Sequence, residues 1–379
     1  MNLDDYRRAA RIWLAEHAHI SDPGLFMGEL HDAGYSGITW PKEWGGQGLT
    51  QAEERVFAEE AAGYTLPTYR FSIGLGMTGP TLVDKGSDEQ RGRFVKPLLR
   101  GEEVWCQLFS EPGAGSDVAA LQTRAVRDGE DWVINGQKVW TSVAQYADWG
   151  LLLTRTNVDV PKHRGMTMFV VDMHDPGVTV RPLKDMTGGA FFNEIFFDDV
   201  RIPDGHRIGE VDDGWSVAVT TLLHERLSIS SGVGMSGQKD NPTALAALRE
   251  VVDTTDPYVR DQLVELHLRT RALELFNQRL GQETKAGIFP GARGSAAKLL
   301  LAELGLFRSD LAVSLVGPDA LTEGHPLAQA LAMAPALALG GGTNEIMRNI
   351  VGDRVLNLPP EPRVDKTVAF KDLKVGTQA

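Results

Sequence analysis

Apolar residues recur with a helical period at the start of the chain. Leu3, Tyr6, Ala10 and Trp13 are three or four residues apart, which places them on one face of a helix over residues 3–19. Residues 51–62 are dense in Ala and Glu and contain neither Gly nor Pro, so they predict a second helix. A further helix is predicted over residues 80–99. The first hundred residues are therefore expected to be mainly helical.

The pattern changes at Trp105 to short β-prone runs separated by tight turns. Asp128-Gly129 and Asn135-Gly136 are turn signals of the kind that join antiparallel strands. Because no helical stretches intervene, the pattern favours an antiparallel barrel or sandwich over a doubly wound sheet. The predicted strands cover residues 123–126, 132–134, 151–155, 166–172, 178–182 and 193–197.

After Gly214-Trp215 the helical period returns and persists. The segment 242–284 is long and rich in Leu, Arg and Glu, and residues 300–315 carry an apolar stripe. Pro257, Pro290 and Gly317-Pro318 are expected to interrupt this helical region. The chain is thus predicted to be an α+β protein with several domains: residues 1–104 form an N-terminal helical domain, 105–212 a central β domain, 213–358 a helical bundle and 359–379 an extended tail.

Composition narrows the class of protein. With 379 residues and 42% apolar residues, the chain has an ordinary soluble globular composition. A net charge of −13 speaks against a nucleic-acid partner, whose phosphates require a basic surface. The single cysteine, Cys106, has no His motif beside it, so a packed structural thiol is favoured over a nucleophile. No apolar run approaches the length of about 18 residues needed for a membrane span, and the amphipathic N-terminus is unlike a signal peptide. We expect a cytoplasmic location and no metal site.

A polar loop over Ser110–Asp117, with the sequence SEPGAGSD, is the first candidate binding segment. Glycines at 113 and 115 let backbone N–H groups approach a ligand closely, and an anion or a polarised ring edge is the natural guest. Taken alone, such a cluster is equally typical of an ordinary connecting loop. Its significance depends on the segments that accompany it.

Four further segments accompany this loop: TWPKEWGGQGL near the start, NGQKVWTS at 135–142, FFDDVRIP at 196–203 and GGGTNEI at 340–346. In this order, and over essentially the whole chain, they resemble the acyl-CoA dehydrogenase family of flavoenzymes. The resemblance implies an N-terminal helical domain, a central antiparallel β-barrel and a C-terminal four-helix bundle, usually assembled as tetramers. It also implies FAD as the cofactor.

The resemblance assigns roles to the first two loops. The segment from Gln107 to Ser116 would lie along the flavin, with the Ser110 hydroxyl at its pyrimidine edge and Ser116 facing coenzyme A. Trp140 would lie against the flavin, although a core aromatic is the alternative. Ser142 stands where relatives commonly have Thr, and it keeps a hydroxyl near N5. The cofactor-binding residues implied are Gln107, Phe109, Ser110, Gly115, Trp140, Thr141, Ser142, Gly342, Thr343 and Glu345.

The glycine-rich segment at 340–346 is predicted to be a loop that opens a helix, where free N–H groups bind phosphate. The family's matching segment contacts the adenosine half of the cofactor. A flexible hinge capped by Thr343 is the alternative. Many relatives carry a catalytic glutamate two residues before this threonine, but this chain has Gly341 there, which cannot abstract a proton.

Glu225 is the alternative base. A subset of the family places a glutamate directly before Arg-Leu on the first helix of the C-terminal domain, and this chain reads HERL at 224–227. Ala218, Leu222 and Ile229 put Glu225 at the edge of an apolar face, where desolvation raises a carboxyl pKa. A partly exposed glutamate paired with an arginine is the competing interpretation. Arg226 is predicted to bind substrate, and His224 is predicted to lie at the surface or to support the site.

A second departure concerns the Arg-Phe-Gly segment with which relatives reach a neighbouring subunit's flavin. Here residues 284–295 read TKAGIFPGARGS, where only Arg293 offers a substitute. This wording resembles a bacterial branch that acts on sterol side chains and other bulky acyl-CoAs, some members of which assemble from two different subunits.

The predicted function is α,β-desaturation of an acyl-CoA to the trans-2-enoyl-CoA, with FAD as hydride acceptor and an electron-transfer flavoprotein as electron acceptor. A homotetramer or heterotetramer is expected. One alternative is a flavin-dependent monooxygenase of the same fold, which uses reduced FMN and oxygen and needs no carboxylate base. Another is a subunit of a heteromeric dehydrogenase, or a structural partner subunit with a degenerate flavin site.

Overall fold

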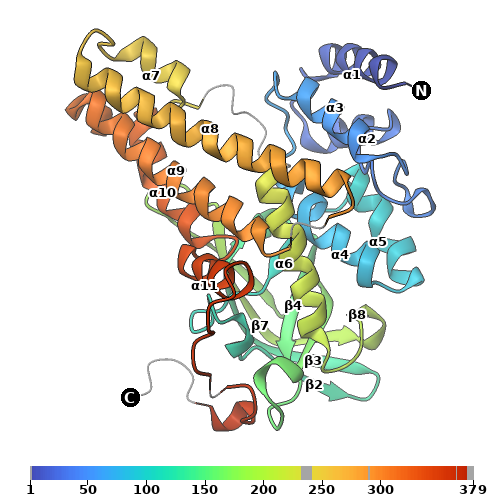
Figure 1. The fold of residues 1–379 in the computed structure, drawn as a ribbon. Coiled ribbons are helices and arrows are strands. Elements are labelled where there is room, and N and C mark those ends of the chain that lie inside the picture. Colours follow the sequence, from blue (N-terminus) through green and yellow to red (C-terminus); the bar gives the residue numbers. More distant parts are fainter. Residues whose placement is uncertain (1, 232–240, 289–290, 364, 374–379) are drawn as a thin grey trace.

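Helices form both ends of the chain and strands form its middle (Figure 1). The structure is a computed structural model, and it describes residues 2–231, 241–288, 291–363 and 365–373. The N-terminal part consists of α1 (Leu3–His17), α2 (Pro23–Asp32), α3 (Gln51–Ala61), a π-helical turn (Gly74–Thr78), α4 (Gly79–Lys85) and α5 (Asp88–Arg100).

Side-chain caps explain where the N-terminal helices begin. The Asn2 side chain accepts a hydrogen bond from the backbone N–H of Asp5 at the start of α1, and Thr50 forms a capping box with Glu53 at the start of α3. Residues 80–99 are helical as predicted, but they form two helices, because Ser87 forms a second capping box and starts α5 as a new helix after α4. Gly101, in the left-handed conformation, ends α5.

The middle of the chain forms one eight-stranded sheet in the order β6-β7-β3-β2-β4-β5-β8, with β1 paired to β4 off this path. Five of the strand pairs are antiparallel as predicted, but β1 and β2 both run parallel to β4. No pairing within the described residues joins β6 to β8, so the predicted closed barrel is not confirmed. The strands are β1 (Trp105–Leu108), β2 (Arg124–Asp128), β3 (Asp131–Ser142), β4 (Trp149–Arg155), β5 (Met166–Asp172), β6 (Val178–Leu183), β7 (Phe192–Pro203) and β8 (Arg207–Ile208).

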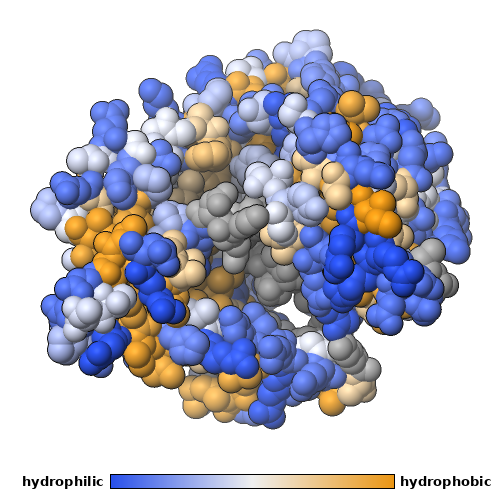
Figure 2. All heavy atoms as spheres, turned by 90° about the horizontal axis from the view of Figure 1, so that it is seen from above, coloured by the Kyte–Doolittle hydropathy of each residue, from blue (hydrophilic) through white to orange (hydrophobic). Residues whose placement is uncertain are grey.

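The C-terminal part is helical. The segment 242–284 is divided at Pro257, where the sequence predicted an interruption, because the Asp256 side chain caps a new helix that begins with this proline. Apolar side chains gather on the left side of the molecule in Figure 2, the side where Figure 1 shows α8, α9 and α10. The helices are α6 (Gly214–Ser231), α7 (Leu245–Val251), α8 (Pro257–Lys285), α9 (Arg293–Val316), α10 (Pro326–Leu339) and α11 (Asn344–Arg354).

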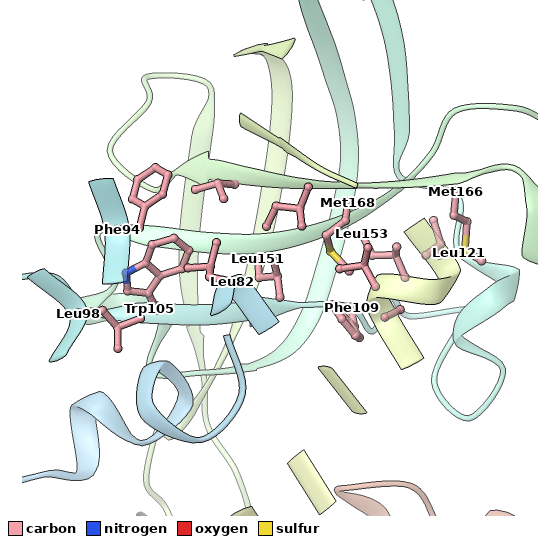
Figure 3. Packing of buried hydrophobic residues seen from close by; sticks show 14 of the residues in the cluster. Leu82, Phe94, Leu98, Trp105, Phe109, Leu121, Leu151, Leu153, Met166 and Met168 are labelled. Carbon is pink, nitrogen blue, oxygen red and sulfur yellow. The ribbon is translucent and has the colours of Figure 1, made fainter. Parts of the chain in front are cut away.

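One apolar core joins the N-terminal helices, the sheet and α6 (Figure 3). Phe94 of α5 packs edge-on against Trp105 of β1, with ring centroids 5.3 Å apart. Val217 and Ala218 of α6 belong to the same cluster, so the first half of α6 is fixed against the sheet. Cys106 is fully buried on the opposite face of β1, as expected for a packed thiol, and burial raises its pKa.

The segment after α11 returns to the sheet. Residues 359–363 form neither helix nor strand, and Phe370–Asp372 form a short 3-10 turn that docks on the β domain. The Phe370 N–H donates to the Val160 carbonyl at 2.8 Å, and the Phe370 ring lies 3.9 Å from the guanidinium of the buried Arg155. The described part of the tail therefore includes a turn that packs on the β domain. None of the helices in the described part of the chain is long and apolar enough to cross a membrane.

Candidate active site

Glu225 lies on α6 where this helix meets β1 and the loop before α11. The Gln107 side-chain amide of β1 donates to Oε2 of Glu225 at 3.2 Å, and the backbone N–H of Gly341 also hydrogen-bonds to this carboxylate. The Glu225 side chain is half-buried, and burial raises its pKa above the ordinary value, although both hydrogen bonds and the charges of Arg226 and Lys298 oppose the shift. The site thus holds a carboxylate whose affinity for a proton is increased.

The loop before α11 brings Gly341 to this carboxylate. Gly341 and Gly342 have φ angles of +67° and +87°, a conformation that favours glycine. Thr343 caps α11 by accepting a hydrogen bond from the Ile346 N–H at 3.2 Å. The sequence position at which many relatives would carry their glutamate is therefore next to Glu225 in space.

Lys298 of α9 supports this loop, and the sequence analysis did not identify it. Its side chain is buried, and its ammonium donates to the Gly342 carbonyl at 2.6 Å. Burial lowers the pKa of Lys298, whereas the nearby Glu225 and Glu345 oppose the shift. A lysine inside the apolar run SAAKLLLAELGLF was a signal that could have indicated it, since a buried lysine needs polar partners.

A buried ion pair shapes the loop at 109–117. The Lys138 ammonium of β3 is fully buried, 2.8 Å from the Glu111 carboxylate and 3.0 Å from the Phe109 carbonyl. Glu111 also accepts hydrogen bonds from the backbone N–H groups of Gln122 and Thr123. Burial acts to raise the pKa of Glu111, but Lys138 and these donors hold it below its usual value. The sequence analysis missed this pair as well.

The end of β3 lies beside this loop, because the Val139 N–H donates to the Ser110 carbonyl at 2.9 Å. Trp140 has a φ of +60° and 61% of its surface exposed, so it is not the core aromatic considered as an alternative. Thr141 is buried, and its hydroxyl has no hydrogen-bond partner within the described residues. Ser142 is half-buried.

The other predicted residues differ in their surroundings. The Phe109 side chain belongs to the apolar core, whereas Gly115 and Ser116 are exposed. Glu345 is exposed in the first turn of α11. Arg293, considered for the missing arginine segment, lies 2.7 Å from Glu283.

Comparison with known proteins agrees with this arrangement. Models of the N-terminal, middle and C-terminal domains of acyl-CoA dehydrogenases match residues 5–102, 106–200 and 212–356. IpdE1 of Mycobacterium tuberculosis is 34% identical, with 96% of this chain and 99% of that protein covered. The chain belongs to the acyl-CoA dehydrogenase family.

Two further comparisons concern the branch of the family that this chain resembles. FadE34 of Mycobacterium tuberculosis is 37% identical over 87% of this chain, but the chain spans only 45% of the length of FadE34. A solved structure described as the Tcur3481-Tcur3483 steroid ACAD, an acyl-CoA dehydrogenase, has a TM-score of 0.79 and 27% identity, with 95% of this chain and 94% of that chain covered. These similarities agree with the bacterial branch indicated by the sequence.

Members of this family use FAD, and the residues of this chain fit a flavin. The unpartnered hydroxyl of Thr141 is a buried polar group that requires a partner, and it follows the exposed Trp140 ring directly. A Cβ added at Gly113 or Gly115 would meet no atom within 4 Å, so these loop positions are open to a ligand. Within the described part of the chain, no three His, Cys, Asp or Glu side chains are arranged to hold a metal ion.

Proposed function

We propose that this acyl-CoA oxidoreductase desaturates an acyl-CoA thioester between its α- and β-carbons, and that Glu225 is the general base. The observation that carries this proposal is the position of Glu225, a half-buried carboxylate with raised pKa held between Gln107 and the Gly341 N–H. A base for an α-proton must be ionised at neutral pH and still bind a proton well, which a raised pKa near the working pH provides. The product is the trans-2-enoyl-CoA.

The chain supplies the base, the orientation of the substrate and the shape of the site. When bound, FAD accepts the hydride that leaves the β-carbon. The Glu225 carboxylate takes the α-proton, so that the electron pair of the α C–H bond becomes the new C=C bond. Thr141 and Ser142 supply hydroxyl groups to the flavin, and Trp140 supplies an aromatic face. The buried pair of Lys138 and Glu111 keeps the loop at 109–117 in one conformation.

The substrate class we propose is a bulky acyl-CoA, on the strength of the relatives. The solved relative is named a steroid ACAD, and it covers nearly the whole chain. Ser116 and Arg226 are proposed to bind coenzyme A and the acyl portion near the base, respectively. An electron-transfer flavoprotein is the proposed electron acceptor.

The proposed assembly is a dimer of dimers. Val264, Leu268 and Leu275 follow one face of α8 at spacings of four and seven residues, and each has about half or more of its surface exposed. Such an apolar stripe is typical of a surface that a second protein covers. A heteromeric version also has support, because the solved relative is named for two proteins.

The monooxygenase alternative is disfavoured by Glu225, since that chemistry requires no carboxylate base. The visible absorption spectrum of the purified protein tests the cofactor first. We expect FAD in a one-to-one ratio and loss of its absorbance when an acyl-CoA is added without oxygen. Recovery of FMN, or of colourless protein that does not take up FAD, would contradict the proposal. Oxygen consumption would then be the next assay.

A further inference from the structure

The side chain of Gln107 carries one group that contacts Glu225 and one that has no partner. Its amide nitrogen donates to the Glu225 carboxylate at 3.2 Å. Its amide oxygen is buried and has no hydrogen-bond partner within the described residues. A buried acceptor without a partner is costly, so a donor is expected to reach it at some stage of the reaction cycle.

Proton abstraction by Glu225 creates such a donor. Before the reaction, Glu225 is a carboxylate that only accepts hydrogen bonds, and the NH₂ group of Gln107 suits it. The α C–H bond of the substrate then breaks and an O–H bond forms on Glu225, which becomes a donor as well. A primary amide carries both a donor and an acceptor, whereas the backbone N–H of Gly341 can only donate and so cannot accept a hydrogen bond from the O–H of the acid.

We propose that Gln107 is a positioning residue for the base, holding the Glu225 carboxylate through its NH₂ group and, once the amide has turned over about its Cγ–Cδ bond, the Glu225 carboxylic acid through its C=O group. This inference rests on the proposed function of Glu225. It extends the role that the sequence indicated for Gln107, which was contact with the flavin. Gln107 does not contact the reacting carbon in this scheme, and it acts through Glu225.

The other groups that face Glu225 come from three elements. Arg226 follows it on α6, Lys298 approaches from α9, and the Gly341 N–H approaches from the loop before α11. Both cations favour the ionised carboxylate over the carboxylic acid. The N–H can only donate, so none of these three groups can accept a hydrogen bond from the O–H of the acid. Gln107 is therefore the group around Glu225 whose chemistry matches both protonation states.

The test is the pH dependence of flavin reduction in the FAD-loaded enzyme with a saturating acyl-CoA and no oxygen. Gln107→Met keeps the length of the side chain and removes both polar groups. In this scheme Gln107 stabilises both forms of Glu225, but its hydrogen bond to the charged carboxylate is the stronger of the two, by about tenfold in equilibrium constant. Losing both bonds should therefore move the acid limb, the pH range in which the rate falls as Glu225 gains a proton, up by about one pH unit. The maximal rate at high pH should fall, while the acyl-CoA concentration for half saturation stays near the parent value.

Gln107→Glu is the second variant, and it tests the proposed role of Gln107 if Gln107→Met does not fold. It keeps the shape and polarity of the side chain but places two carboxyl groups together, which should give two titration steps. Gln90→Met is the matched control. Gln90 is also buried and donates to the carbonyls of Gly205 and Arg207 at 2.8 Å, so its loss should lower the melting temperature and leave the acid limb unchanged.

An acid limb at the parent pH in both Gln107 variants would overturn the proposal. Weaker FAD binding by Gln107→Met, with an unmoved acid limb once the variant is loaded with FAD, would also overturn it and assign Gln107 to the flavin alone. Failure of the proposed function is distinguishable, because Glu225→Gln would then reduce the flavin at the parent rate. If Glu225→Gln is inactive and the Gln107 variants titrate like the parent, only the role of Gln107 is wrong.

Discussion

Moving the carboxylate from α6 to the loop before α11 tests whether both positions address the same α-carbon. Glu225→Gln keeps the shape of the side chain but removes its basicity, so flavin reduction should slow by a factor of about 10²–10⁴. Each tenfold loss corresponds to about 1.4 kcal/mol, so the barrier should rise by about 3–5 kcal/mol. FAD and acyl-CoA should still bind, because the amide accepts a hydrogen bond where the carboxylate did.

Adding Gly341→Glu to this variant should restore part of the rate. The Gly341 N–H already touches the Glu225 carboxylate, so a side chain at this position begins close to the substrate carbon that Glu225 addresses. With φ at +67°, a side chain there costs about 1–2 kcal/mol, against a total stability of about 5–15 kcal/mol for a typical domain. The double variant should therefore fold, and we expect a recovery of about tenfold or more.

The assay is the loss of oxidised-flavin absorbance after rapid mixing with acyl-CoA in the absence of oxygen. Flavin content and melting temperature show whether each variant is folded and loaded. Glu16→Gln makes the same chemical change on the exposed surface of α1 and should behave like the parent. Parental rates in Glu225→Gln would refute the assignment of the base. A folded, flavin-bound double variant that is no faster than Glu225→Gln would refute the inference that side chains at positions 225 and 341 address the same α-carbon.

Three further predictions concern pH, the cofactor and assembly. Because Glu225 must be ionised to act and its pKa is raised, the rate of flavin reduction should rise with pH and reach half its maximum above pH 4.5; a midpoint at or below 4.5 would show that another group titrates. Thr141→Val should weaken FAD binding without destabilising the FAD-free protein, since the hydroxyl has no protein partner among the described residues. Thr154→Val removes a hydroxyl that donates at 3.0 Å to the Thr167 carbonyl, and should lower stability by about 1–3 kcal/mol in denaturant titrations; equal effects of the two variants would contradict this reasoning. Sedimentation should show a tetramer that Leu268→Asp weakens, and a stable active monomer would remove the proposed assembly.

The secondary structure was predictable where local signals act alone. The predicted strand 166–172 coincides with β5, because a short, mainly apolar run that is buried on both faces is a local property. The helix break at Pro257 was predicted from the proline itself, whereas the break at Ser87 was missed although it carries a capping signal, since composition outweighed the cap in the prediction. The parallel pairing of β1 with β4 could not be predicted, because strand order depends on contacts between distant segments.

The residues of the candidate site were likewise predictable only where the signal is local in the sequence. Glu225 was predicted to be the base from a short motif that resembles part of the family and from an apolar helical face, both of which are local. Lys138 and Lys298 were missed because an isolated lysine resembles a surface residue, and their partners, Glu111 and the Gly342 carbonyl, lie 27 and 44 residues away. A pattern along the chain does not reveal which distant carbonyl or carboxylate will satisfy a buried cation.

The docking of Phe370 on Arg155 has a consequence for how the protein is made. Arg155 is buried in the β domain, with its guanidinium bonded to the carbonyls of Lys162 and Ala119 and covered by the Phe370 ring, and burial lowers its pKa to about 10. Domains emerge from the ribosome in order and tend to fold as units. The strands of this sheet are synthesised long before Phe370, so the nascent β domain must hold an incompletely covered cation while the whole helical half is made. A message truncated near its 3′ end would therefore damage the middle of the protein as well as its tail.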